Sequence, residues 1–367
     1  MAEKAIRLGG ESTADAIVSA VDAMYTEHTF AEKDFALKHN EDEISVDTNF
    51  AAQNFWKEAL IRFFNKKSAV LGLVLIVIIV LLAVLGPGMN SYTYSGQDLS
   101  QKNFAPRVPG IEQFGILDGS EKMSTTTGSK SVNAYVEKGK DDVYYWFGSD
   151  TYGRDIWTRT WEGARVSLII AVAAAIIDMV IGMSYGLISG YFGGRVDMVM
   201  QRFLEVANGI PRLVIVTLLL LVLQPGMVTI IFALMLTEWV GMSRIARAEM
   251  LKLKDQEFVL ASRTLGAGSF FIIFKEVLPN IIGPIITQVM FSIPTAIFTE
   301  AFLSFVGLGI PVPQCSLGSL ISELYNSFTT HPYQIIPPIV VMSLLMLSFN
   351  LVADGLREAL DPKMKSM

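Results

Sequence analysis

Carboxylates inside long apolar segments are the residues of this chain best suited to chemistry. Asp178 falls within one apolar run and Glu300 near the end of another. Inside a membrane-spanning helix a carboxylate is costly unless it faces a bundle interior, a partner or water. For Asp178, the only charge expected deep in a span, we favour a structural hydrogen bond between helices, and for Glu300 a position at the membrane interface. Both remain candidates, with Pro294, for residues that line a pathway.

Other catalytic chemistry is not visible. The histidines His28, His39 and His331 are scattered and Cys315 is the single cysteine, so the sequence predicts no metal site and no intrachain disulfide. Residues 148–155 have the glycine spacing of a phosphate-binding loop but lack the Lys-Ser/Thr that would hold phosphate and magnesium. We therefore predict no catalytic residue, no cofactor and no metal in this chain.

Composition indicates that these residues belong to an all-α polytopic membrane protein. Hydrophobic residues make up 51%, charged residues only 17%, and the mean hydropathy is +0.44. The net charge of −6 reflects acidic residues in the first 50 positions and in one large loop, whereas short loops elsewhere are basic. Roughly 65 mostly polar residues precede the first apolar block, which is therefore read as an uncleaved span and not as a signal peptide.

Six segments are predicted to cross the membrane. The first covers residues 68–85, ends at the Gly-Pro-Gly of 86–88, and is long enough for a hydrocarbon core of about 30 Å. The second, 166–191, carries Gly182, Gly186 and Gly190 at a four-residue spacing, which allows close approach of another helix. The others are predicted at 213–223 (extended back to 203 and kinked at Pro211), 228–242, 281–305 and 335–353.

The fifth span, 281–305, is the first candidate for a helix that lines a pathway. Pro284 and Pro294 are expected to interrupt it, and broken spans occur where they are buried in protein or line a cavity.

Lys and Arg in the short connections predict the orientation. They flank the first span and fill the second-to-third connection, the fourth-to-fifth connection and the C-terminal tail, whereas residues 224–227 and 307–333 contain none. Six spans with both termini in the cytosol satisfy every connection. The predicted divisions are an acidic cytosolic extension (1–50), an interfacial amphipathic helix (51–67), the first span (68–88), a large extracellular insertion (89–165), a core with a cytosolic loop at 244–280 (166–360) and a cytosolic tail (361–367).

The loop at 244–280 is the longest polar interruption in the apolar second half. It predicts a short helix at 257–265, a break at Gly266 and Gly268, and a second helical run that ends at Leu278-Pro279, where proline can neither donate nor continue the helix. A water-facing helix between spans is typical of a docking element for a soluble partner. An ordinary basic loop, whose charges only set the topology, is the alternative.

This loop resembles the EAA loop of ABC-importer permeases, both in EFVLASRTLG at 257–266 and in the Leu-Pro that follows twelve residues later. Residues 147–155 and 163–168 are similar to the GTDxxGRD…GARxSL run of C-type permeases in the oligopeptide/dipeptide branch. Further runs that fit this branch lie at 190–194, 300–309 and 349–362, and those at 102–110 and 114–119 resemble oligopeptide members with a longer outer loop.

The resemblance implies a type I ABC importer permease fold in a bacterial cytoplasmic (inner) membrane, as a non-catalytic subunit of a binding-protein-dependent oligopeptide importer. The implied partners are a homologous second permease, two ATPases that bind ATP and Mg, an extracellular substrate-binding protein, membrane lipid and peptide, without nucleic acid. Dipeptide, nickel and opine importers share these motifs and remain alternatives, whereas a stand-alone secondary transporter would need a repeat that is not seen. The residues implied to couple to the ATPases are Glu257, Ala261, Ser262, Gly266, Leu278 and Pro279.

Overall fold

The computed structural model describes residues 55–125 and 128–360, and the predicted extension at 1–50 and tail at 361–367 lie outside this range. Within it the chain is mainly helical, with five helices long and apolar enough to cross a membrane, or six if one bent pair counts as a span. The first of the five consists of α4 (Lys67–Leu85) and η2 (Gly86–Gly88), and the second of α6 (Ile156–Ile177), η5 (Asp178–Gly182) and α7 (Met183–Phe192). The third consists of α10 (Met227–Thr237) and α11 (Trp239–Leu253), and the fourth of α13 (Ser269–Phe271), η6 (Ile272–Val277), α14 (Leu278–Leu303) and η7 (Ser304–Leu308). The fifth consists of η8 (Pro332–Gln334) and α16 (Ile336–Leu360).

The bent pair replaces the predicted third span. α8 (Gly194–Gly209) and α9 (Arg212–Val222) meet at an angle of 77° around Pro211. The kink was expected, but helix begins at Gly194, where the sequence suggested a basic connection. Proline fixes its own backbone and lacks an N–H, so it separates two helices readily.

Three predicted helix breaks are wrong. α14 runs without interruption through Pro284 and Pro294, and Pro279 lies in its first turn. Packing against α6 and α16 keeps the helix intact where proline removes a hydrogen bond. Pro279 is tolerated because N–H groups in the first turn of a helix have no acceptor within that helix. The wider π-helical turn η6 directly before α14 also shifts the hydrogen-bond register.

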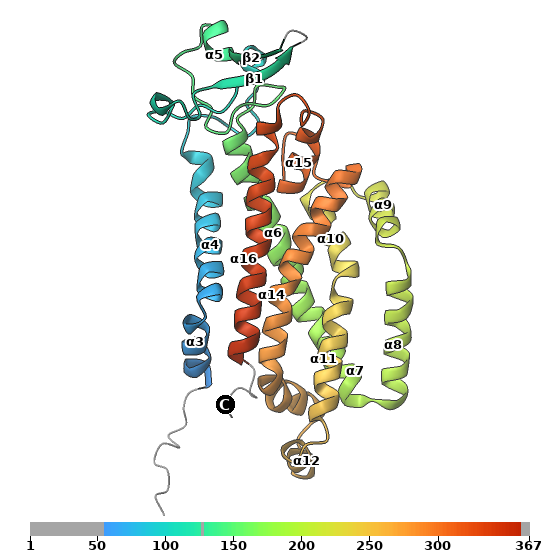
Figure 1. The fold of residues 1–367 in the computed structure, drawn as a ribbon. Helices are drawn as coiled ribbons and strands as arrows, with labels where there is room; N and C mark the ends of the chain where they lie inside the picture. The colour runs from blue at the N-terminus through green and yellow to red at the C-terminus, as the bar shows by residue number, and fades with distance from the viewer. Residues whose placement is uncertain (1–54, 126–127, 361–367) are drawn as a thin grey trace, which may run out of the picture. The chain divides into compact units, whose positions relative to one another are not determined.

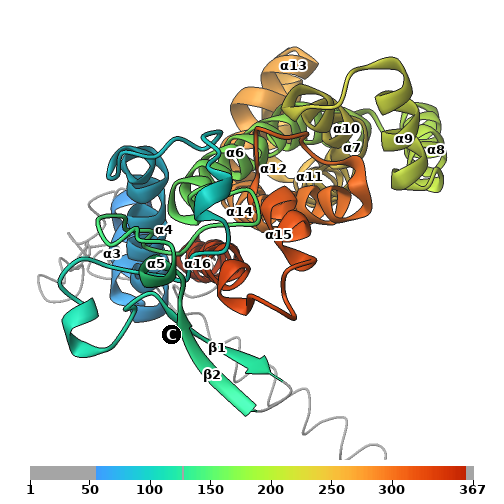
Figure 2. The same ribbon diagram turned by 90° about the horizontal axis from the view of Figure 1, so that it is seen from above.

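The spans pack into one bundle, in which α14 lies against α6 and α16, and α16 lies against α4 (Figures 1 and 2). Small residues make these approaches close. A Cβ added at Gly72 of α4 would lie 2.8 Å from the Ser348 carbonyl oxygen of α16. The central apolar cluster draws on α4, α6, α10, α14 and α16, with Ile170, Ile230, Ile297 and Leu345 fully or almost fully buried.

The glycine stripe of the second span faces α11. Added Cβ atoms at Gly182, Gly186 and Gly190 would lie 2.6, 2.1 and 2.8 Å from Trp239 O, Ser243 O and Met250 Cβ. Each position therefore requires glycine, because any side chain would push α7 away from α11.

The insertion before α6 is partly β-structure, which the all-α prediction lacked. β1 (Ser120–Thr125) and β2 (Gly128–Asn133) form an antiparallel hairpin with Ser120 opposite Asn133. Phe104, Tyr135 and Tyr145 form a small buried aromatic cluster in the same insertion. Short helical turns complete the insertion: η3 (Leu99–Gln101), η4 (Glu112–Phe114) and α5 (Ala134–Glu137). α6 itself begins at Ile156, ten residues before the predicted span.

The hairpin and the short helix α12 (Glu257–Thr264) lie at opposite ends of the bundle (Figure 1). We call these the hairpin end and the α12 end. α3 (Phe55–Asn65) also lies at the α12 end, and α15 (Leu317–Tyr325) packs near the hairpin end.

Candidate coupling helix and buried polar clusters

α12 is attached to the bundle through one buried side chain. Val259 is fully buried in an apolar cluster with Met250 of α11, Ile273 and Val277 of η6, and Leu187 of α7. The remaining α12 residues are exposed or half-buried. Arg263 also lies over the ring of Tyr191 of α7, with Cζ 5.5 Å from the ring centroid. The helix is thus held by one buried side chain and one surface contact, and presents the rest of its surface.

Glu257 and Ala261 are exposed on α12, and Ser262 is half-buried. Apolar side chains also face outward here: Leu260 is 42% exposed, and Leu265, directly after the helix, is 87% exposed. Exposed apolar side chains beyond the end of a bundle are typical of a surface that a partner covers.

Gly266 turns the chain away from α12. Its φ of +85° is a left-handed conformation that favours glycine, although a Cβ there would meet nothing within 4 Å. Its N–H donates to Arg263 O, and the N–H of Ala267 donates to Ser262 O, both at 3.0 Å. Glycine at this position therefore serves the backbone conformation.

The sequence overestimated the length of the loop at 244–280. Residues 244–253 continue α11, and residues 269–280 belong to the helical run that becomes α14. Leu278 packs against the cluster around Val259, whereas Pro279 is exposed. Only residues 254–268 connect the two spans, with α12 at their centre.

Arg247 forms an internal ion pair. Its Nε and Nη2 donate to the two carboxylate oxygens of Asp197, each at 2.6 Å, and Ser189 Oγ donates to Asp197 at 2.5 Å. This pair joins α11 to α8 at the α12 end, a role that sequence charge alone did not indicate.

Asp178 lies in the π-helical turn between α6 and α7, with its side chain 3% exposed. Ser292 of α14 donates to its Oδ2. Its Oδ1 has no hydrogen-bond partner among the described residues. The structure thus contains the helix-to-helix hydrogen bond that the sequence favoured.

A second carboxylate inside a span was missed. Glu238 lies between α10 and α11, its Oε1 is 2.7 Å from Arg212 Nη1, and Arg212 also donates to Thr299 of α14 at 2.9 Å. Asp178 is therefore not the only deep charge, and Arg212 does not lie in a basic connection. Glu238 falls inside the predicted span 228–242, which was the signal available.

Glu300 is fully buried inside the bundle near the end of α14. Its carboxylate accepts hydrogen bonds from Ser304 at 2.7 Å, Ser316 at 2.5 Å and Ser167 at 3.3 Å. These serines belong to η7, the N-cap of α15 and α6. Glu300 thus joins three elements through hydrogen bonds. Pro294, the third pathway candidate, is also buried within α14.

The glycine-rich run at 148–155 is organised around a buried carboxylate. Asp150 accepts hydrogen bonds from the Tyr152 and Arg154 N–H groups at 2.8 and 2.9 Å, from Arg154 Nε at 2.7 Å and from Arg159 Nη1 at 2.8 Å. Both arginines also pair with Glu323 of α15. The run therefore ties the insertion to α6 and α15.

Neighbouring carboxyls at the hairpin end respond to burial in opposite ways. Burial alone would raise the pKa of Glu323, but the charge and hydrogen bonds of Arg159 and Arg154 outweigh it and hold that pKa below its usual value. Burial raises the pKa of Asp155, the N-cap of α6, although hydrogen bonds from Thr158 and Asn90 act in the opposite direction.

Over residues 55–125 and 128–360, no cluster of three or more His, Cys, Asp or Glu side chains is placed to hold a metal ion. Cys315 is buried, with its Sγ 3.4 Å from Arg159 O. The polar clusters described above can thus hold helices together and keep carboxylates inside the bundle.

Comparison with known families gives two matches along the chain. Residues 182–366 match the binding-protein-dependent transport system inner membrane component, and residues 54–106 match the N-terminal TM domain of oligopeptide transport permease C. The first match contains α12 and the second contains α3 and α4.

Two curated relatives cover most of both chains. The oligopeptide transport system permease protein OppC of Bacillus subtilis is 41% identical over 85% of this chain and 91% of its own. The dipeptide transport system permease protein DppC of the same organism is 38% identical over 90% and 93%. A solved chain of the inward-facing MetNI methionine ABC transporter overlaps 54% of this chain and 94% of its own at 16% identity; its TM-score of 0.47 is too low to support an argument. On the strength of the sequence matches, the chain belongs to the family of binding-protein-dependent transport system inner membrane components, in the branch of the oligopeptide and dipeptide C permeases.

Proposed function

We propose that this chain is the permease subunit of an ATP-driven oligopeptide importer and contributes half of the translocation pathway. A homologous permease would complete the pathway, and two ATPases, which bind the ATP and Mg, would supply the energy. A substrate-binding protein would deliver the peptide at the hairpin end. Family membership and relatives named for peptide transport support this proposal.

The observation that carries the coupling role is the sparse attachment of α12 to the bundle. Val259 holds the helix to the bundle, whereas Leu260 and Leu265 remain exposed. A cleft in a soluble ATPase would cover these apolar side chains, and Ala261 and Ser262 are small enough for close approach. Movement of the ATPases would reach α11 and α14 through the cluster around Val259.

In this proposal the α12 end faces the cytosol and the hairpin end faces outward. Both termini lie on the cytosolic side, and the chain adopts the type I importer permease fold with six spans. Basic residues in the connection that contains α12, Lys254 and Arg263, agree with this orientation.

Gly266→Pro in the reconstituted complex tests the coupling. Proline cannot adopt a φ of +85° and removes the hydrogen bond to Arg263 O, so ATP-driven uptake should be lost while membrane insertion is preserved. Gly268→Pro is the matched control, because Gly268 has a φ of −69° that proline accepts. Uptake that survives Gly266→Pro would refute the role of α12.

A dipeptide importer is the second candidate, favoured by the 38% identity to a dipeptide permease over 90% of this chain. Nickel and opine importers of the same branch are weaker alternatives. Competition of labelled uptake by dipeptides and by longer peptides, with the cognate binding protein present, separates the two peptide classes. If dipeptides compete and longer peptides do not, the oligopeptide assignment fails.

A further inference from the structure

The exposed side chains of the bundle differ in chemistry from one face to another. In the middle of α4, α6 and α10 they are apolar, for example Val77, Val172 and Phe232. Apolar side chains of this kind suit contact with lipid tails. α14 and α16 instead carry polar side chains on their outward sides.

On α14 the outward residues alternate between polar and aromatic. Thr295, Phe298 and Phe302 are exposed, and Gln288 and Phe291 are half-buried. They are spaced three and four residues apart, so they form one stripe along the helix. Gln288 lies ten residues inside α14, which places it about 15 Å from the start of the helix.

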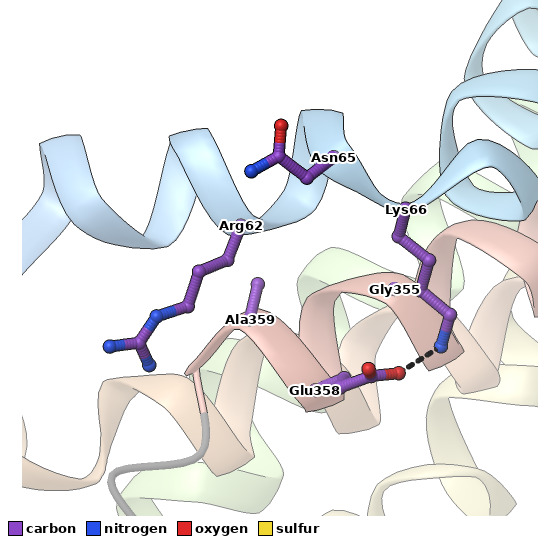
Figure 3. Close-up of a pocket in the computed structure, with 6 residues that line it drawn as sticks. All are labelled: Arg62, Asn65, Lys66, Gly355, Glu358 and Ala359. Atoms are coloured by element: carbon purple, nitrogen blue, oxygen red, sulfur yellow. Dashed lines mark hydrogen bonds and ion pairs between the residues drawn. The ribbon is translucent and has the colours of Figure 1, made fainter. Parts of the chain in front are cut away.

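A second exposed stripe, on α16, consists of Val340, Ser343, Leu347 and Asn350. At the end of the same helix Glu358 pairs with Lys66, in the pocket between α3 and α16 that Figure 3 shows. Asn350 precedes Glu358 by eight residues and therefore lies about 12 Å further inside the bundle. Both stripes thus bring polar groups to bundle depth.

The two stripes face the same way. Each lies on the side of its helix opposite the residues that enter the central cluster, Ile293 on α14 and Leu345 on α16. α6 packs against both helices on that cluster side, and Figure 1 shows it behind them. The two stripes therefore form one surface, which we call the α14–α16 face.

The polar groups of this face are available to a ligand. Among the described residues, none is placed to hydrogen-bond the side chains of Gln288, Ser343 or Asn350. An unpaired amide or hydroxyl is costly against lipid tails, so water or another molecule must cover this face.

The other side chains of the face indicate what covers it. Phe298 and Phe302 would hold the backbone of another helix at a distance, whereas closely packed helix pairs in membranes use small residues. Uncharged hydrogen-bonding groups between aromatic rings instead match a peptide, whose backbone carries an N–H and a C=O at almost every residue.

We propose that the α14–α16 face lines the peptide pathway. Gln288, Ser343 and Asn350 exchange hydrogen bonds with the peptide backbone, and the phenylalanines of α14 contact peptide side chains. Bonds to the backbone do not depend on the peptide sequence, so this face accepts varied peptides. The inference rests on the proposed import of peptides, and it assigns the lining to residues other than the buried Pro294 and Glu300.

Thiol labelling tests which face meets water, in the reconstituted complex with both permeases, the ATPases and the binding protein. Thr295→Cys and Asn350→Cys place one thiol on each stripe. Val77→Cys and Ile176→Cys are the matched controls, at exposed positions of α4 and α6. A charged reagent attacks the thiolate, which forms where water reaches the sulfur, so the stripe variants should react at least about 10-fold faster than the controls. Cys315 is buried, and the unmodified chain gives the background.

Two labelling results would overturn the proposal. Equal rates in the stripe and control variants would mean that lipid covers the face. Fast labelling of the isolated chain in detergent, together with slow labelling in the complex, would assign the face to the second permease.

A transported peptide that carries benzoylphenylalanine tests the contact itself. Illumination during uptake should cross-link it to α14 or α16, and mass spectrometry of the chain locates the adduct. Cross-links confined to other helices would overturn the inference. Uptake by the unmodified complex separates the two claims: no uptake of any peptide would refute the proposed function, whereas uptake without labelling of the stripes refutes only the lining.

Discussion

Arg159 Nη1 lies 2.8 Å from Asp150 Oδ2, and both side chains are almost completely buried. Through this ion pair the insertion and the first turn of α6 share one charged centre, which Glu323 of α15 completes. Buried charges of this kind stabilise a fold only as a complete set, because each partner removed leaves another without compensation.

Asp150→Ala should therefore destabilise the chain by about 3–5 kcal/mol, because it leaves two buried arginines without a central acceptor. The measurement is the apparent Tm of the purified protein in detergent. Asp142→Ala removes an exposed carboxylate from the same insertion and should change stability by less than about 0.5 kcal/mol. Similar Tm values for the two variants would show that the ion pair contributes little.

Acid should weaken this centre through Glu323. Because its pKa is held below the usual glutamate value of 4.5, its stabilisation is complete above that pH and is lost as the pH falls through the lowered value. The Tm difference between the unmodified chain and Glu323→Gln should thus be largest near neutral pH and shrink below pH 4.5. Asp155, whose pKa is raised, is present in both proteins, so its opposite pH effect cancels. A difference that stays constant down to acid pH would contradict this assignment.

Gly186→Ala should separate α7 from α11, because the added Cβ would lie 2.1 Å from Ser243 O. We expect a loss of about 1–3 kcal/mol, the usual cost of overpacking. Gly241→Ala is the matched control on α11, since nothing lies within 4 Å of its Cβ position. Thermal unfolding of both variants compares them, and equal stability would mean that the backbone shifts freely at Gly186.

Arg212 and Glu238 should show strong coupling in a double-mutant cycle. Arg212→Ala leaves Glu238 in a span without its cation, whereas Arg212→Ala/Glu238→Gln removes both charges. The double variant should therefore be more stable than Arg212→Ala alone, because it leaves no unpaired carboxylate in the span. Tm values of the unmodified chain, Arg212→Ala, Glu238→Gln and the double variant give the coupling energy. Additive effects would show that the ion pair does not contribute to stability.

Leu265→Ser separates docking from stability. The side chain is 87% exposed and should contribute little to the fold of the isolated chain. If an ATPase covers it, the variant should insert and unfold normally while ATP-driven uptake falls several-fold. Val259→Ala is the contrasting variant: it creates a cavity in the cluster below α12 and should lower the Tm as well. Normal uptake by Leu265→Ser would remove this residue from the docking surface.

Long apolar runs predicted the spans better than they predicted the ends of the spans. The Val/Ile/Leu run of α4 was placed within one residue at its start. The start of α6 was missed because the charged residues Arg159 and Glu162 suggested a loop. Arg159 is nevertheless buried, because it pairs with Glu323, which lies 164 residues further along the chain. No local pattern encodes a pairing of that length.

The candidate coupling site around α12 was likewise predicted only in part. The glycine turn after α12 was visible in the sequence, since Gly266 follows a short amphipathic run. The continuation of helix through Pro279 was not, because local rules count proline as a stop and cannot include the π-helical turn before it. The burial of Glu300 could not be predicted, because its three serine donors come from separate elements.

The attachment of α12 mainly through Val259 has an evolutionary consequence. Because the other positions of α12 make few demands on the bundle, they can diverge together with whatever protein covers them. Exchange of the exposed α12 residues between related permeases should then change which protein is recruited, without any change in the membrane-spanning helices.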